Sequence, residues 1–159
     1  MRWNMGYEQG KGIFVTGFLG SDRKGLAEKL AAELGYRAMD LDTEIEKADG
    51  RSVQRICMTM GEHEYRNKEY ETLEKLTSME RIVVSCGDGV LLDDMSREIL
   101  SQNQVVIADA ELGPEELWEK AKGQTGIPYA FMQMGDETAR REKFMVLYQQ
   151  RKGMYQEFQ

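Results

Sequence analysis

The sequence has few of the residues that build disulfide frameworks, thiolate metal sites or histidine-based catalytic centres. Among 159 residues there are two cysteines, two prolines and one histidine. Cys57 and Cys86 lack the spacing of a metal site, and we expect them to be reduced thiols in the core. His63 lies between two glutamates, which predicts an exposed helix position. Triad chemistry and a zinc site are therefore poorly supported.

The chain also lacks long apolar runs and an excess of positive charge. No apolar stretch approaches the roughly 20 residues that cross a membrane, and the first residues lack the apolar core of a signal peptide. A net charge of −7 argues against nucleic acid or an anionic membrane as the main partner. We therefore expect a cytoplasmic, single-domain protein with neither kind of partner.

Short apolar runs alternate with helical patterns along the rest of the chain. Residues 1–12 are polar and are predicted to be an N-terminal extension, which leaves one domain at residues 13–159. Strands are predicted at 12–17, 36–42, 81–86 and 103–110. Helices are predicted at 21–34, 42–50, 52–61, 62–76, 93–102, 114–123 and 136–158, the last as one long helix or a pair. This alternation predicts an α/β fold with a parallel sheet, whose ligands bind beyond the carboxyl ends of the strands.

The first predicted strand runs into "GFLGSDRKG", which resembles a phosphate-binding loop with altered residues. The pattern G-x-x-x-x-G-K-[ST] needs glycine, lysine and a hydroxyl residue where this chain has Asp22, Arg23 and Lys24. Gly17 and Gly20 fit the first half of the pattern. A carboxylate at position 22 would repel phosphate, and the hydroxyl that ligates Mg²⁺ is missing.

Three interpretations of this loop remain open on sequence grounds. Ser21 or Asp22 is suited to cap the following helix with a side-chain oxygen. The loop is alternatively a triphosphate site in which Arg23 or Lys24 replaces the usual lysine. The third alternative is a site for a different anion.

Five segments in order carry a family resemblance. They are "IFVTGFLGS", "DLDTEIE", "GEHEYRNKE", "VVSCGDGVLL" and "YQQRKGMY". Over about residues 12–158 the chain resembles the shikimate kinase family of P-loop kinases. The resemblance implies a three-layer fold with a short central parallel β-sheet flanked by helices. Because the chain stops at residue 159, we expect the family's final edge strand to be missing, which exposes the fourth strand to a protein partner or to self-association.

The resemblance also implies roles for particular residues. Asp42 and Arg23 are expected to be catalytic, and Asp40 is expected to belong to the metal shell. The expected substrate-binding residues are Asp42, Arg66, Gly87, Gly89 and Arg151. The expected nucleotide-binding residues are Gly17, Gly20, Arg23 and Lys24.

The residues themselves support part of this assignment and leave alternatives. Arg66 and Arg151 each share a helical face with apolar residues, a placement suited to holding a small carboxylate. The alternatives are an Arg66–Glu69 ion pair and an Arg151 side chain that reaches along the surface to solvent. For Asp40 and Asp42 the alternative role is capping of the next helix, and Asp42 is the better placed of the two.

Departures from the family pattern concentrate on the nucleotide side. Ile127 stands before Pro128 where the family has a lid arginine, and the segment that packs on adenine is absent. Asp88 replaces the middle glycine of the substrate loop and would repel a carboxylated substrate unless it faces solvent or pairs with an arginine.

These departures favour a pseudokinase with little or no phosphotransfer, which retains a site for a shikimate-like small molecule and needs no cofactor. One alternative is an active shikimate kinase that uses ATP and Mg²⁺ in aromatic amino-acid biosynthesis. Another is a regulatory or structural subunit that binds no small molecule in this cleft.

Overall fold

A short parallel sheet forms the centre of the protein. The computed structural model describes residues 6–124 and 134–159. Its strands are β1 (Ile13–Thr16), β2 (Arg37–Asp40), β3 (Ile82–Ser85) and β4 (Gln104–Ile107), arranged in the order β2-β3-β1-β4. All three pairings are parallel, and β1 lies between β3 and β4. The predicted α/β architecture is therefore confirmed.

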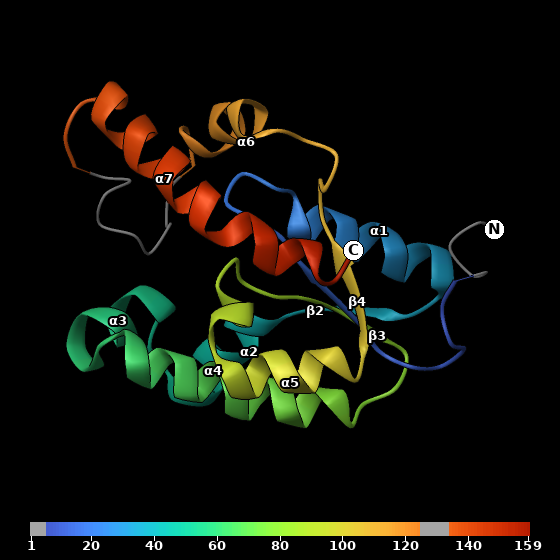
Figure 1. The fold of residues 1–159 in the computed structure, drawn as a ribbon. Coiled ribbons are helices and arrows are strands. Elements are labelled where there is room, and N and C mark those ends of the chain that lie inside the picture. The colour runs from blue at the N-terminus through green and yellow to red at the C-terminus, as the bar shows by residue number, and fades with distance from the viewer. Residues whose placement is uncertain (1–5, 125–133) are drawn as a thin grey trace.

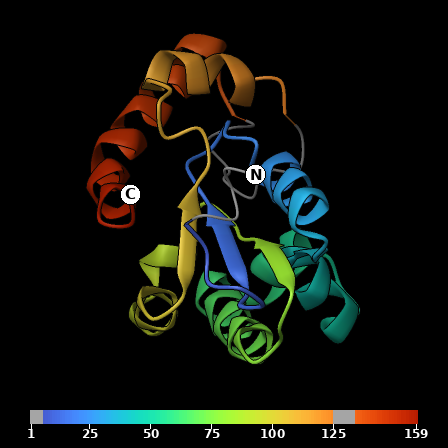
Figure 2. The ribbon, with the colours of Figure 1, turned by 90° about the vertical axis from the view of Figure 1, so that its right-hand side faces the viewer.

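Helices cover both faces of this sheet (Figures 1 and 2). The helices in chain order are α1 (Arg23–Leu34), α2 (Leu41–Asp49), α3 (Val53–Met60), α4 (Glu62–Thr77), α5 (Asp94–Ser101), α6 (Pro114–Ala121) and α7 (Glu137–Gln156). A 3₁₀ turn, η2 (Val90–Leu92), precedes α5. The last helix is single, which settles the choice between one helix and a pair.

The side chains of β1 alternate between the two faces, as a buried strand requires. Ile13 and Val15 pack with Leu30 of α1 in one apolar cluster. Phe14 packs on the other side, in the larger cluster that includes Leu73 of α4 and residues of α6 and α7. The result is the expected three-layer arrangement.

The position of β4 in the sheet was predicted from the sequence. β4 lies at one edge of the sheet, as predicted. That this edge binds a partner or a second copy stays a prediction, as does the division into a 1–12 extension and a 13–159 domain. Within residues 6–124 and 134–159, no helix has the length and apolar character needed to cross a bilayer.

Candidate functional site

The carboxyl ends of the strands bring the predicted site segments together. The hydroxyl of Thr16, at the end of β1, donates a 2.8 Å hydrogen bond to the carbonyl of Gly87 beyond β3. The Ala108 N–H, beyond β4, donates to the Thr16 carbonyl at 2.8 Å. The "GFLGSDRKG" loop, the "CGDG" segment and the "ADA" segment are therefore neighbours, as the parallel topology predicts.

Gly20 holds the loop in a conformation that other residues rarely adopt. Its φ is +90°, and a Cβ added there would overlap the Leu117 carbonyl of α6. On either side of it, Leu19 and Ser21 are buried. The Ser21 hydroxyl donates to the carbonyl of Phe18 at 2.6 Å rather than capping the helix. The loop is thus pinned between the sheet and α6.

Asp22 is the residue that caps α1. Its Oδ1 accepts a 3.0 Å hydrogen bond from the Gly25 N–H, which decides between the two predicted caps in favour of Asp22. Its own N–H donates at 2.8 Å to Oδ2 of Asp109, just beyond β4. Two carboxylates of the chain therefore contact backbone N–H groups at the start of α1, where helix geometry favours an anion.

The cations of the loop do not converge on the helix start. Nη1 of Arg23 lies 3.8 Å from Oδ1 of Asp88, and Lys24 is exposed in the first turn of α1. No hydroxyl stands at position 24 to ligate Mg²⁺. In this arrangement the loop residues fit a magnesium–triphosphate group poorly, since carboxylates lie where phosphate oxygens would be held.

The structure decides which of Asp40 and Asp42 caps the next helix. Asp40, not Asp42, is the N-cap of α2, because β2 ends two residues earlier than predicted. Its Oδ2 accepts hydrogen bonds from the N–H and hydroxyl of Thr43, and its Oδ1 accepts one from Ser85 at 2.6 Å. Both oxygens are thus engaged within the chain, and a metal role for Asp40 stays a prediction. In residues 6–124 and 134–159 no group of three metal-ligating side chains assembles.

Asp42 lies in the first turn of α2 and its side chain contacts α4. The Tyr65 hydroxyl donates to Asp42 Oδ1 at 2.7 Å and lies 3.3 Å from Oε2 of Glu69. Burial raises the pKa of Asp42 above its ordinary value, and the bond from Tyr65 opposes that rise. Burial also raises the pKa of Glu69 to about 7, against the attraction of Arg66. Burial therefore raises the pKa of both carboxyl groups of this cluster, which lies beside the strand ends.

The Arg66 guanidinium lies between α4 and the "CGDG" segment. Its Nη1 donates to Oε1 of Glu69 at 2.9 Å and its Nη2 donates to Glu62 at 3.2 Å. The Arg66–Glu69 pair predicted as an alternative is therefore present. A Cβ added at Gly89 would overlap this guanidinium, so a larger residue there requires the end of the Arg66 side chain to move.

Arg151 lies beneath the strand ends instead of reaching the solvent, so the surface alternative was wrong. The side chain is 9% exposed, and its Nη1 lies 2.5 Å from Oδ2 of Asp88. The Tyr155 hydroxyl donates to the backbone carbonyl of Asp88. Asp88 is accordingly buried and paired with arginine, the second of its two predicted placements.

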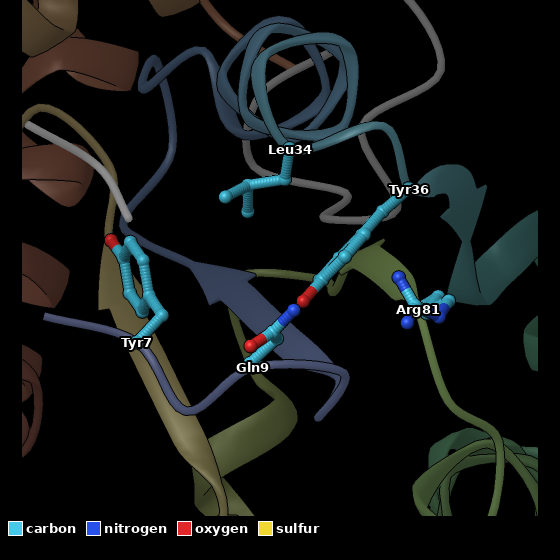
Figure 3. A pocket seen from close by; sticks show the side chains of 5 residues that line it. All are labelled: Tyr7, Gln9, Leu34, Tyr36 and Arg81. Carbon is cyan, nitrogen blue, oxygen red and sulfur yellow. The ribbon is translucent and has the colours of Figure 1, made fainter. Parts of the chain in front are cut away.

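A separate hollow of about 300 Å³ lies at the opposite ends of the strands (Figure 3). Tyr36 and Arg81, which line it, directly precede β2 and β3. The Tyr36 hydroxyl points toward Gln9 in this view and accepts a 2.7 Å hydrogen bond from the Gly10 N–H. Since ligands of parallel sheets bind at the carboxyl ends, this hollow is distinct from the candidate site.

The structure brings together most of the predicted site residues, but not all of them. Hydrogen bonds through Tyr65 and Glu69 connect Asp42 to Arg66, and Gly89 lies against Arg66. Asp88, between Gly87 and Gly89, pairs with Arg151 and Arg23. Lys24 does not contact this group, and Ile127 and Pro128 fall outside the described residues. His63 is exposed, Cys86 is buried, Cys57 is half-buried, and both thiols are free, as expected.

Sequence reasoning missed three contributors to the site: Asp109, Tyr65 and Tyr155. Asp109 was detectable as an acidic residue at a strand end. Tyr65 lies in the quoted segment "GEHEYRNKE" and Tyr155 shares a helical face with Arg151, but neither was assigned a role.

Comparison with known proteins agrees with this arrangement. The family model described as "Shikimate kinase" matches residues 20–159. A shikimate kinase from Chlorobium limicola is 35% identical over 130 residues, which are 82% of this chain and 65% of that protein. One from Chlorobaculum tepidum is 40% identical over 116 residues, covering 73% of this chain and 60% of the relative. The chain thus spans about two thirds or less of the length of these relatives.

A solved structure supports the same conclusion. A shikimate kinase from Acinetobacter baumannii, determined in complex with shikimate, superimposes with a TM-score of 0.80 at 26% identity. The match covers 93% of this chain and 79% of the other. Fold, strand-end site and sequence similarity together place this chain in the shikimate kinase family.

Proposed function

We propose that this chain transfers a phosphoryl group from a nucleoside triphosphate to a hydroxyl of a shikimate-like small molecule. The observation that carries the proposal is the position of Asp42 at the strand ends. Its half-buried carboxyl group has a raised pKa and is held by Tyr65, in the same region as Arg66 and Arg151. A carboxylate held in this way is suited to accept the proton of an attacking hydroxyl. The family relationship supports the same reaction class.

The acceptor half has the components that such a role requires. Arg66 and Arg151 supply cationic groups on α4 and α7, and the backbone of Gly89 lies against the Arg66 guanidinium. Tyr65 orients Asp42 through a single hydrogen bond. ATP with Mg²⁺ is the donor that the family relationship favours, but because the loop fits that group poorly, we derive no step through it. The proposed transfer is accordingly slow.

A second candidate function is binding of the acceptor without transfer. The loop contacts favour it, since Asp22 and Asp109 already contact N–H groups at the start of α1. A phosphate entering there meets two like charges, each costing from roughly 1 kcal/mol in water to about 4 kcal/mol at an effective dielectric of 20. In this case the protein is a pseudokinase that needs no cofactor.

The first experiment is a calorimetric titration of Mg–ATP into the purified protein with shikimate in the cell. Micromolar nucleotide binding accompanied by turnover heat supports the kinase and eliminates the pseudokinase. Absence of nucleotide heat, together with a clear signal for shikimate alone, selects the second candidate. No signal from Mg–ATP, from shikimate or from its uncharged methyl ester contradicts both candidates, and points to a regulatory or structural subunit.

A further inference from the structure

Asp88 links the two halves of the candidate site through a single buried carboxylate. Its Oδ2 lies 2.5 Å from Nη1 of Arg151 on α7, and its Oδ1 lies 3.8 Å from Nη1 of Arg23 at the start of α1. The Asp88 side chain is 9% exposed. Two guanidinium groups that are distant in sequence therefore meet on one anion, and that anion belongs to the chain itself.

The backbone at Asp88 is fixed as well as the side chain. The Tyr155 hydroxyl donates to the Asp88 carbonyl, and the preceding Gly87 carbonyl accepts from Thr16. The following Gly89 lies against the Arg66 guanidinium. With hydrogen bonds on both sides, the carboxylate is held in place between the two arginines instead of reaching them by a flexible loop.

The three arginines around the acceptor region are all matched by carboxylates of this chain. Arg66 pairs with Glu69 and Glu62, while Arg23 and Arg151 share Asp88. An entering carboxylate would have to displace Asp88 from a buried, charge-assisted hydrogen bond or lie beside it. Both options are unfavourable, because a displaced charge loses its partner and a neighbouring like charge repels. A neutral hydroxylated ring meets neither penalty.

We propose that Asp88 is a built-in carboxylate ligand that fills the anion position between Arg23 and Arg151, so that the acceptor site selects a neutral polyol over a carboxylated one. This inference rests on the proposed function for the choice of acceptor class. It makes Asp88 the specificity-determining residue of the site. That Asp88 occupies this anion position does not depend on the identity of the acceptor, and a second experiment tests it.

The selectivity test compares shikimate with its methyl ester, which keeps the ring hydroxyls and removes the charge. We expect the wild-type protein to bind the ester at least about fivefold more tightly, since that ratio corresponds to the weaker of the two like-charge penalties. Asp88→Asn, which keeps the shape and removes the charge, is expected to abolish or reverse this preference. Asp94→Asn removes an exposed carboxylate on α5 and is expected to leave the preference unchanged. If the wild type and Asp88→Asn have the same ratio of ester affinity to shikimate affinity, the proposal is overturned.

Whether Asp88 occupies the anion position is tested with sulfate as the probe and thermal unfolding as the readout. At constant ionic strength, sulfate in place of chloride is expected to stabilise Asp88→Asn and Asp88→Gly more than it stabilises the wild type or Asp94→Asn, because sulfate also stabilises folded proteins in general. The glycine variant provides a second form should the asparagine variant fail to fold. If sulfate stabilises both Asp88 variants more than the wild type while neither ring compound binds any form, the built-in ligand is supported and the proposed function fails. If sulfate has the same effect on all four proteins, the assignment of Asp88 is overturned whatever the ring compounds do.

Discussion

The Tyr65 hydroxyl lies 2.7 Å from Oδ1 of Asp42 and donates its proton to that carboxylate. The same hydroxyl is 3.3 Å from Oε2 of Glu69, one turn further along α4. One phenol thus joins a carboxyl group of α2 to one of α4, below the ends of the sheet. Because a hydroxyl has one proton to donate, the shorter contact identifies Asp42 as its acceptor.

Removing this hydroxyl tests how much it contributes to the stability of the folded protein. Tyr65→Phe is expected to lower the free energy of unfolding by about 1–3 kcal/mol, because a buried carboxyl group loses its hydrogen bond. The pKa of Asp42 is expected to rise further, since the bond from Tyr65 lowers it. Urea unfolding at pH 7 measures the first effect. The matched control is Tyr70→Phe, whose hydroxyl bonds Glu74 at the surface and whose loss is expected to cost about 0.5 kcal/mol or less. Equal losses would contradict the buried role of Tyr65.

Glu69 is expected to make the protein less stable as pH rises. Burial raises its folded-state pKa to about 7 from an ordinary value of 4.5, so between these values the folded protein binds more protons than the unfolded chain. Stability from this group is therefore complete below about pH 4.5 and is lost as pH rises through 7. The full change is about 3 kcal/mol by the linkage relation.

The comparison with Glu69→Gln isolates this effect from other titrating groups. The free energy of unfolding of the wild type is expected to fall, relative to that of Glu69→Gln, as the pH rises from 5 to 8. Denaturant unfolding at both pH values provides the measurement. A difference that is independent of pH would show that the carboxyl group titrates normally.

Restoring the loop is expected to restore nucleotide affinity. The triple change Asp22→Gly, Arg23→Lys and Lys24→Ser removes the capping carboxylate and supplies the missing cation and hydroxyl. We expect the Kd for Mg–ATP to fall at least about fivefold, from removal of one like charge. Calorimetry measures it, with Lys24→Ser alone as the control that leaves Asp22 in place. An equal gain in the control, or no gain in the triple variant, would locate the obstacle elsewhere, with Asp109 as the next residue to change.

Gly20 is expected to tolerate alanine less well than Gly35 does. Both residues have positive φ, +90° and +73°, which costs an alanine roughly 1–2 kcal/mol. Gly35 has open space around its missing Cβ, whereas a Cβ at Gly20 would overlap the Leu117 carbonyl. Gly20→Ala should therefore cost about 1–3 kcal/mol more in unfolding free energy. Fluorescence of the neighbouring Trp118 should change in Gly20→Ala only, and equal costs would argue against contact between the loop and α6.

Local patterns were sufficient to predict the elements and to narrow the choice of helix caps. The strands and helices follow alternating and helical apolar patterns, and the parallel sheet follows from their order. Asp22 was one of two predicted caps and contacts Gly25 three residues away. Where a local prediction failed, at Asp40 and Asp42, the error was the end of a strand, which moved the cap by two residues.

The sequence by itself determined the α/β fold and the gathering of the candidate-site segments at the strand ends, because these depend on periodicity and on chain order. Only the tertiary structure decided which charges meet. Asp22 and Asp109 are separated by 87 residues, and Asp88 and Arg151 by 63. Such contacts depend on strand order and on how α7 packs across the sheet, and neither is encoded in the residues near either partner.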